Sequence, residues 1–309
     1  MRVLCCGAGA VGSLLAVRLA HAGHDVLLLG RSTRAAPPHG TFTLRLPDGT
    51  HVAAAPRIAQ APAPPYAGAP AELVILATKS YDTGEALESV AGAMGPNTLL
   101  LTVHNGLGNE EAAARWSDRV VAGSFTLSVS LPDPGRVVQH TRSGGLALAD
   151  THPGAGQAEA LAEVFRHAGL RVCTCPNWRA MKWSKLLLNL LANATCAILQ
   201  LPPRQVLADP RLFRLEQTAF REARRTMRRL GLSPVNLPGY PVRLLCAVMT
   251  LPPTLARAAM ARRAAEGRGE KLPSLAIDLV RGRGKSEVDA LNGAVARIAA
   301  ECGGCAPVN

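Results

Sequence analysis

The chain has 309 residues, a formal net charge of +12, 48% hydrophobic residues and 18% charged residues. A chain of this length usually folds as two domains, and this composition supplies enough apolar side chains for a sizeable core. The arginines are spread along the sequence without interleaved aromatic residues, so the charge does not indicate nucleic-acid binding. We attribute it to biased composition and to attraction for small anionic ligands.

No segment of the sequence indicates export or a membrane span. The first apolar run is interrupted by Gly7, and the later apolar stretch carries the amides of Asn189 and Asn193. The eight cysteines do not follow the spacing of a secreted disulfide framework, and Cys302 and Cys305 lack the second pair that a zinc site needs. We therefore expect a cytoplasmic protein with no membrane partner and no bound metal.

The start of the chain carries the pattern of a strand, a helix and a second strand. Residues 3–6 and 26–29 are short apolar runs with the length and composition of buried strands, and apolar residues recur at helical spacing between them. Gly7, Gly9 and Gly12 lie between the first strand and the helix at the spacing G-x-G-x-x-G. This context makes the glycine motif much more specific than it would be alone.

Each glycine of the motif has its own purpose in a dinucleotide site. Gly7 permits a tight turn, Gly9 lets a pyrophosphate approach the backbone, and Gly12 lets the helix pack closely on the strand. The N–H groups at the start of the helix then face the phosphates. We predict that the cofactor is bound by Gly7, Ala8, Gly9, Ala10, Val11 and Gly12.

The residues after the second strand indicate which dinucleotide is bound. NAD-binding proteins usually place a carboxylate there to accept from the ribose 2′-hydroxyl. This chain has Arg31 and Arg34 instead, and a guanidinium fork pairs well with phosphate oxygens. We therefore predict that the cofactor is NADP(H).

Strand and helix patterns continue to about residue 176. The expected elements are a hairpin over residues 41–58, strands at 73–77, 98–103, within 119–149 and at 170–174, and helices at 83–94 and 156–168. Lys79 and Asn105 follow two of these strands, and residues at the carboxyl ends of parallel strands line the ligand crevice. The glycine turn, Arg31, Lys79 and Asn105 are therefore expected along one edge of the sheet.

The pattern becomes entirely helical after Pro176. Helical periodicity covers residues 178–199 and 210–231, further segments up to 265, and two segments at 274–282 and 286–300. No strand pattern returns. The sequence therefore predicts an α/β protein, in which a Rossmann dinucleotide-binding domain over residues 1–176 precedes an all-α domain over residues 177–309.

Lys185, Asn189 and Asn193 lie at i, i+4 and i+8 of the first helical segment, so we expect them to share one face. An ammonium and two amides among leucines need polar partners. They suit a 2-keto acid, because a lysine can donate a proton to the carbonyl oxygen while amides orient the other oxygens. Lys182 is the rival lysine, about 60° off this stripe, and we expect it to affect turnover little.

Four motifs together resemble the ketopantoate reductase family along nearly the whole chain. They are the N-terminal glycine fingerprint, Asn105-Gly106-Leu107-Gly108, Trp183-Ser-Lys185-Leu-Leu-Leu-Asn189, and Ser274 followed by Glu287-Val-Asp289 and Asn292-Gly293. The resemblance implies reduction of 2-dehydropantoate (ketopantoate) to pantoate with NADPH, a step of pantothenate and coenzyme A synthesis. One departure is Asn193-Ala194, where the family usually has Asn-Pro.

The resemblance also implies roles for single residues. Lys185 matches the proton donor, and Glu287 matches an acidic catalytic residue near the substrate and the nicotinamide. Asn105 matches a residue that contacts both cofactor and substrate, and Lys79 matches one near the cofactor. The substrate contacts implied in this way are Asn105, Lys185, Asn189, Asn193 and Ser274.

Two other functions stay open at this point. One is a related oxidoreductase acting on another 2-keto acid or an opine-like substrate. The other is a non-catalytic NADP-binding sensor, which the presence of Lys185 and Glu287 argues against. In each case the partner is a small molecule and not a nucleic acid, and the chain is expected to be a monomer or a homodimer.

Overall fold

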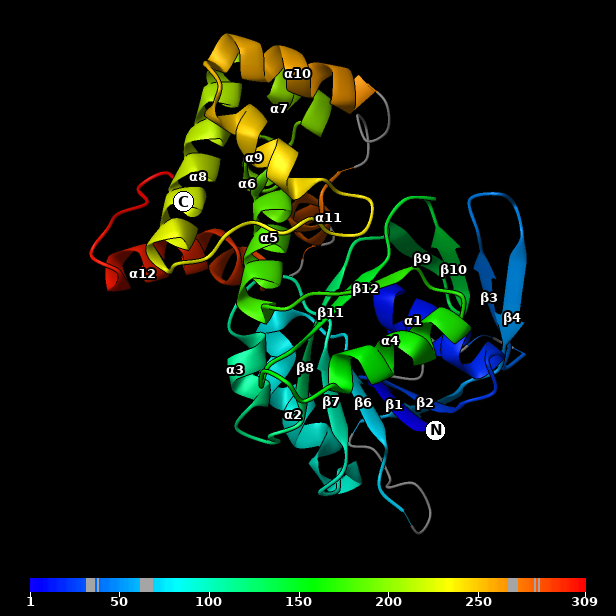
Figure 1. Ribbon diagram of the computed structural model, residues 1–309. Helices are drawn as coiled ribbons and strands as arrows, with labels where there is room; N and C mark the ends of the chain where they lie inside the picture. Colours follow the sequence, from blue (N-terminus) through cyan, green and yellow to red (C-terminus); the bar gives the residue numbers. More distant parts are fainter. Residues whose placement is uncertain (32–36, 38, 62–68, 266–271, 281, 283) are drawn as a thin grey trace. The chain divides into compact units, whose positions relative to one another are not determined.

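The computed structural model describes residues 1–31, 37, 39–61, 69–265, 272–280, 282 and 284–309 (Figure 1). These residues form two compact units. The α/β unit comprises residues 1–104, 108–178 and 237–240, and the helical unit comprises residues 105–107, 179–236 and 241–309. The expected fold class, an α/β domain followed by a helical domain, is confirmed.

The α/β unit is built on an eight-stranded sheet in the order β12-β11-β8-β7-β6-β1-β2-β5. Its strands are β1 (Arg2–Cys6), β2 (Asp25–Gly30), β5 (Arg57–Gln60), β6 (Leu73–Leu76), β7 (Leu99–Thr102), β8 (Val120–Phe125), β11 (Leu146–Asp150) and β12 (Val172–Thr174). All neighbouring strands are parallel except β8 and β11. The strand order reverses at β1, which places the glycine turn at the switch point of the sheet.

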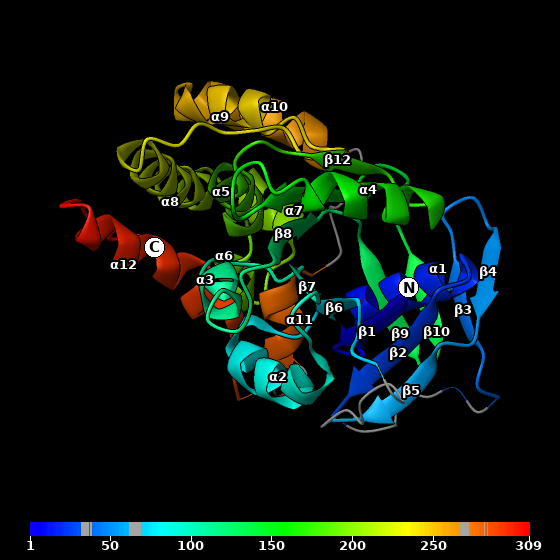
Figure 2. The same ribbon diagram turned by 60° about the horizontal axis from the view of Figure 1, so that its bottom comes forward.

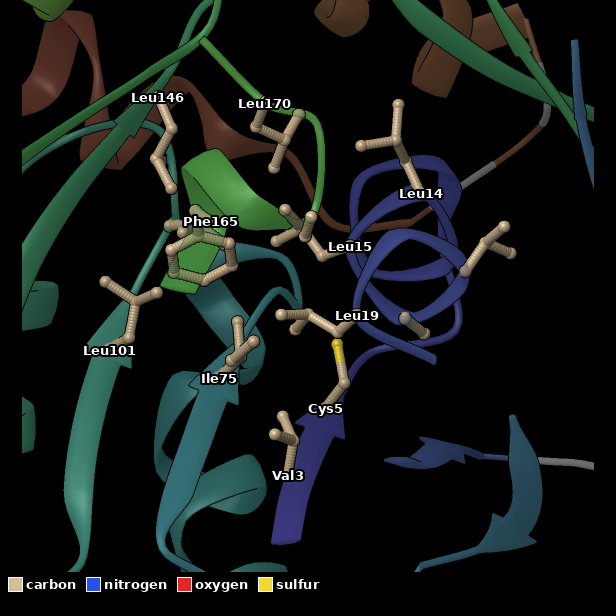
Figure 3. Close-up of a cluster of buried hydrophobic side chains, with 14 of the residues drawn as sticks. Val3, Cys5, Leu14, Leu15, Leu19, Ile75, Leu101, Leu146, Phe165 and Leu170 are labelled. Carbon is tan, nitrogen blue, oxygen red and sulfur yellow. The ribbon is translucent and has the colours of Figure 1, made fainter. Parts of the chain in front are cut away.

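Helices cover both faces of this sheet, so its strands read as continuous apolar runs. Val3 and Cys5 of β1 belong to the cluster that includes α1 (Ala10–His21) and α4 (Gln157–His167), as Figure 3 shows for the α1 side. Leu4 and Cys6 belong to the cluster on the opposite face with α2 (Thr83–Val90) and α3 (Asn109–Ala113). The period of two along β1 therefore distributes alternate side chains between two cores.

A second, four-stranded sheet has the order β4-β3-β10-β9 (Figure 2). Its strands are β3 (Phe42–Arg45), β4 (His51–Ala54), β9 (Val129–Asp133) and β10 (Arg136–Gln139). The expected hairpin is confirmed as the antiparallel pair β3–β4, although it belongs to this small sheet rather than the large one. Phe42 and Leu44 of the hairpin are buried in the same cluster as the leucines of α1, which contacts both sheets.

The helical unit contains α5 (Trp178–Leu190), α6 (Ala194–Leu199), α7 (Pro203–Ala208), α8 (Pro210–Arg229), α9 (Val242–Thr250), α10 (Pro253–Ala265), α11 (Ser274–Val280) and α12 (Asn292–Glu301), with a short 3-10 helix at Glu287–Ala290. The twenty-residue α8 packs against α7, α9, α10 and α12 (Figure 1). It begins at Pro210, where the Asp209 side chain accepts from the N–H groups of Arg211 and Leu212. Among the described residues, no helix has the length and apolarity that crossing a membrane requires.

Candidate functional site

The glycine turn has the close packing that its sequence predicts. A Cβ on Gly12 would lie 2.0 Å from the carbonyl oxygen of Gly7, and a Cβ on Gly7 would lie 2.7 Å from the backbone of Ala77. Gly7 also adopts φ +115°, which side-chain-bearing residues rarely tolerate. Glycine is therefore required at both positions by the protein's own backbone.

Gly9 differs because a Cβ there would meet nothing within 4 Å. Gly9 is exposed, and its backbone is extended at φ −85°, so the fold itself does not require a glycine. The open space at Gly9 fits a group that must approach the backbone. The first turn of α1 carries no acidic residue and no side-chain cap, which leaves its positive end available for phosphates.

Arg31 directly follows β2, at the carboxyl edge of the sheet. Its guanidinium Nη1 lies 3.4 Å from a carboxylate oxygen of Asp82, whose side chain is only 9% exposed, while the Arg31 side chain is 71% exposed. The buried carboxylate fixes one side of an otherwise solvated guanidinium. Arg34, the second predicted phosphate contact, lies outside the described residues.

Lys79 follows β6 and is half-buried at the start of the 3-10 helix Ser80–Asp82. A buried polar network holds this loop in place. Thr78 and Thr83 both contact Nε2 of His104, at 3.0 and 3.4 Å, and the Thr83 hydroxyl also donates to Oδ1 of Asn109 at 2.8 Å. These hydrogen bonds connect the loop that follows β6 to the loop that follows β7.

Asn105 lies in the loop that follows β7, but residues 105–107 belong to the helical unit. The Nδ2 group of Asn189 in α5 donates to Oδ1 of Asn105 at 3.1 Å. The Leu107 N–H donates to the carbonyl of Ala290, and Gly106 packs so closely there that a Cβ would lie 2.5 Å from that carbonyl. Two predicted site residues, 84 positions apart in sequence, therefore lie in direct contact.

The expectation of one continuous helix over residues 178–199 is wrong. α5 ends at Leu190 and α6 begins at Ala194, with Ala192 in the left-handed region at φ +53°. Lys185 and Asn189 keep their i, i+4 relation on α5, but Asn193 occupies the N-cap of α6 and does not continue their stripe. The chain turns here at Asn193-Ala194 without a proline.

Asn193 is buried, and its Oδ1 accepts from the N–H of Leu275 at 3.3 Å. Leu275 is the second residue of α11, which begins at Ser274. Asn193 thus satisfies one of the N–H groups that a helix start leaves without an intrahelical partner. This contact brings Asn193 beside Ser274, another predicted substrate contact.

Lys185 is half-buried on α5, whereas Lys182 is only 1% exposed. Lys182 is therefore a buried side chain rather than a solvated lysine. A substitution that tests it as the rival of Lys185 must preserve its volume. Glu287 is 2% exposed and begins the 3-10 helix Glu287–Ala290. The carbonyl of Ala290, the last residue of this helix, accepts from the Leu107 N–H. A carboxylate this deeply buried is expensive unless polar partners surround it.

Sequence reasoning missed Glu216, a second deeply buried carboxylate of the helical unit at 4% exposure. It accepts from the N–H of Ala192 at 2.6 Å and from the Thr195 hydroxyl. A signal was present, because Glu216 falls between Phe213 and Phe220 on the buried face of α8. A charged residue on an apolar helical face indicates a specific polar partner.

Outside these residues, the structure offers little that resembles a metal or disulfide centre. Cys302 and Cys305 carry free thiols, and within the described ranges no three His, Cys, Asp or Glu side chains gather as they would around a metal ion. Cys5 and Cys6 are buried in the sheet, and burial raises the pKa of the Cys6 thiol to about 11. These thiols are therefore poor nucleophiles at neutral pH.

Both parts of the chain match family models. Residues 3–153 match the model described as Ketopantoate reductase PanE/ApbA, and residues 177–309 match Ketopantoate reductase PanE/ApbA C terminal. These two ranges contain every candidate residue discussed above.

Known proteins and structures are similar over nearly the full length. The 2-dehydropantoate 2-reductase of Archaeoglobus fulgidus is 27% identical over 307 residues, covering 98% of this chain and 92% of that protein. A crystal structure of a PanE/ApbA family ketopantoate reductase from Ralstonia eutropha JMP134 has a TM-score of 0.80 at 27% identity, covering 99% of this chain and 93% of that one. A structure of D-mandelate dehydrogenase with NADH and anilino(oxo)acetate has a TM-score of 0.82 at 22% identity, covering 100% of this chain and 94% of that one, and shares the fold.

Proposed function

The chain belongs to the ketopantoate reductase family, and from this premise we propose that it reduces 2-dehydropantoate to pantoate with NADPH. The observation that carries the proposal is the contact between Asn105 and Asn189, one helical turn from Lys185. It places one predicted site amide beside another on the helix that carries the proposed acid. Relatives named 2-dehydropantoate 2-reductase support the choice of substrate.

The cofactor proposal is supported by residues of the α/β unit. Gly9 leaves open space where a pyrophosphate would approach, and Arg31 offers an exposed guanidinium for a 2′-phosphate. Ala8, Ala10, Val11 and Lys79 are proposed as further contacts on the same loops. When bound, the nicotinamide supplies the hydride that reduces the carbonyl carbon.

The remaining chemistry is assigned to residues of the helical unit. Lys185 would hydrogen-bond the substrate's carbonyl oxygen, stabilise the charge that develops there and donate its proton. Asn105, Asn189, Asn193 and Ser274 would orient the substrate's other oxygens. We assign Glu287 as the second catalytic residue, because its carboxyl oxygens can accept a hydrogen bond from a substrate hydroxyl.

Two further expectations accompany this proposal. We place the functional boundary between a cofactor domain and a substrate domain at residue 176, which the start of the second matched range at residue 177 supports. The oligomeric state, monomer or homodimer, stays a prediction.

A turnover assay tests the proposal directly. Oxidation of NADPH is followed with 2-dehydropantoate, with short aliphatic 2-keto acids and with an aryl 2-keto acid, since D-mandelate dehydrogenase shares the fold. We expect the highest kcat/KM with 2-dehydropantoate, by about tenfold or more, equivalent to about 1.4 kcal/mol of transition-state binding. Preference for another keto acid would favour the alternative oxidoreductase, and intact NADPH binding without turnover would favour the sensor.

A further inference from the structure

The break between α5 and α6 needs an explanation, because no glycine or proline lies in it. Ala192 adopts φ +53°, a left-handed conformation that is unfavourable for residues with a Cβ. Ala192 is also buried, so its N–H cannot be satisfied by bulk water. Something outside the local sequence must therefore stabilise this turn.

Glu216 of α8 supplies that stabilisation. One carboxylate oxygen accepts from the Ala192 N–H at 2.6 Å, and the other accepts from the Thr195 hydroxyl in the first turn of α6. Burial raises the pKa of Glu216, and these two hydrogen bonds oppose the increase. The same carboxylate helps burial to raise the pKa of the neighbouring Cys196 thiol to about 12.

The two hydrogen bonds of Glu216 lie on either side of Asn193. Ala192 precedes Asn193 in the chain and Thr195 follows two residues later, so the carboxylate holds both ends of the segment that carries this amide. Asn193 in turn accepts from the Leu275 N–H at the beginning of α11. A continuous chain of contacts therefore runs from Glu216 through Asn193 to the residue next to Ser274.

We propose that Glu216 is a positioning residue for the substrate, which holds Asn193 and the start of α11 in the geometry that binds the keto acid. This inference rests on the proposed function, because Asn193 and Ser274 are substrate contacts only within it. Glu216 itself makes no contact with the substrate. It acts by holding a left-handed turn that the local sequence does not favour.

The chain offers a matched control on the same helix. Glu222 is likewise 4% exposed on α8, and it accepts from the backbone N–H groups of Val308 and Asn309 at 3.2 Å. Glu216→Ala and Glu222→Ala each remove a buried carboxylate that accepts from at least one backbone N–H. A general loss of stability would affect both variants, whereas a positioning defect would affect only the first.

Steady-state kinetics separate the two variants. For Glu216→Ala we expect the KM for 2-dehydropantoate to rise by about tenfold, with a smaller change in kcat and an unchanged KM for NADPH, because a displaced orienting amide weakens ground-state and transition-state binding alike. For Glu222→Ala we expect both KM values to stay within about twofold of wild type. Equal keto-acid KM values in the two variants would overturn the inference.

Two further variants keep the test informative if Glu216→Ala folds poorly. Glu216→Gln retains an acceptor for the Ala192 N–H, and its amide can donate to the Thr195 hydroxyl, so we expect a KM near wild type. Adding Ala192→Gly to Glu216→Ala should recover part of the lost affinity, because glycine adopts positive φ without a Cβ penalty. A Gln variant as impaired as the Ala variant, or no recovery with glycine, would count against the positioning role.

Hydrogen exchange without substrate tests whether Glu216 holds Asn193 and α11 in place, independently of any activity. We expect Glu216→Ala to exchange faster than wild type over residues 191–199 and 272–280, and Glu222→Ala to match wild type there. Unchanged exchange in Glu216→Ala would overturn the inference. A wild-type protein that reduces no 2-keto acid would overturn the proposed function, while this exchange comparison still decides whether Glu216 holds Asn193 and α11.

Discussion

The α/β unit and the helical unit present their candidate residues in different ways. In the α/β unit the glycine turn offers backbone atoms at a strand end, and among its described candidates only Arg31 and Lys79 contribute long side chains. In the helical unit every candidate is a polar side chain, and several depend on a neighbour, as Asn189 does on Asn105 and Asn193 on Leu275. The proposed cofactor site (the cofactor side) is therefore fixed mainly by backbone packing, and the proposed substrate site (the substrate side) by hydrogen-bond partners.

This difference predicts how each side responds to mutation. A backbone-made site is sensitive where a new Cβ intrudes and tolerant elsewhere, since its N–H groups persist in any sequence that keeps the fold. A side-chain-made site loses function when a partner one contact away is removed, because a buried amide or carboxylate depends on exact orientation of its neighbours. Substitutions on the two sides should therefore separate turnover, cofactor affinity and stability.

The largest effect is expected at Lys185 on the substrate side. Lys185→Ala should lower kcat by about 10²–10⁴ while leaving NADPH affinity nearly unchanged, because it removes a proton donor and no cofactor contact. Lys185→Arg should also stay slow, since a guanidinium keeps the charge but does not give up its proton at neutral pH. Stopped-flow hydride transfer and NADPH titration measure the two quantities.

Lys182 serves as the neighbouring control, with a substitution suited to its burial. Truncation to Ala would leave a cavity, because Lys182 is 1% exposed. Lys182→Met keeps most of the volume, and we expect kcat within about threefold of wild type. Loss of turnover in Lys182→Met with retention in Lys185→Ala would show that the proton donor has been assigned to the wrong lysine.

The next effect separates two glycines of the same motif on the cofactor side. Gly9→Ala should fold normally but weaken NADPH binding by about a hundredfold, because its methyl group fills the open space left for the pyrophosphate. Gly12→Ala should instead lower stability by about 1–3 kcal/mol or more, since its Cβ would lie 2.0 Å from the Gly7 carbonyl oxygen. Thermal melts and calorimetric NADPH titrations distinguish them, and a destabilised Gly9→Ala would contradict the assignment.

Arg31 is a side-chain candidate on a cofactor side that is made mainly of backbone atoms, so its substitution tests the comparison between the two sides. Arg31→Ala should cost about 1.5–3 kcal/mol of NADPH binding, or roughly tenfold to a hundredfold, if the guanidinium pairs with the 2′-phosphate. The kcat/KM with NADH should change little and provides the internal control. Equal kcat/KM values for NADPH and NADH in the wild type would remove the basis for this role.

The smallest effect concerns the pH dependence of stability on the substrate side. Burial raises the folded-state pKa of Glu216 above its unfolded value, so its contribution to stability is largest at low pH and is lost as pH rises through both values. Glu216→Gln lacks this titration. The unfolding free energy of the Gln variant relative to wild type should therefore increase from about pH 4, near the ordinary Glu pKa, towards neutrality, as denaturant titrations would show. A difference that is flat with pH would contradict the direction of the shift.

Local sequence patterns predicted the α/β unit well because its elements are specified locally. The glycine spacing, the apolar strands and the hairpin over residues 41–58 each carry their signal within a few residues. The structure confirms the strands and the hairpin. The partner of that hairpin was not predictable in this way. β3 pairs in parallel with β10, some ninety positions further along the chain, and such pairing has no local signature.

The helical site was less predictable from local sequence, because its geometry depends on residues far apart in the chain. The sequence indicates the amides of Asn189 and Asn193, but it predicts helix through the turn between α5 and α6 because Leu191 and Ala192 have no helix-breaking character. The N–H of Ala192 in that turn donates to Glu216, which lies 24 residues further along the sequence and reaches it only in the folded chain. Periodicity identifies which residues are polar within an apolar helix, but a tertiary contact decides where they point.

The position of α1 between two sheets has a consequence for the kinetics of cofactor association. Leu14 and Leu15 pack in a cluster that also contains Val3 of the large sheet (Figure 3). The same cluster contains Phe42 of the small sheet. The helix whose start would receive the phosphates is therefore packed into the core independently of any ligand. Binding at this end should occur in a single bimolecular step whose observed rate rises linearly with NADPH concentration, with no slow phase from ordering of the glycine loop.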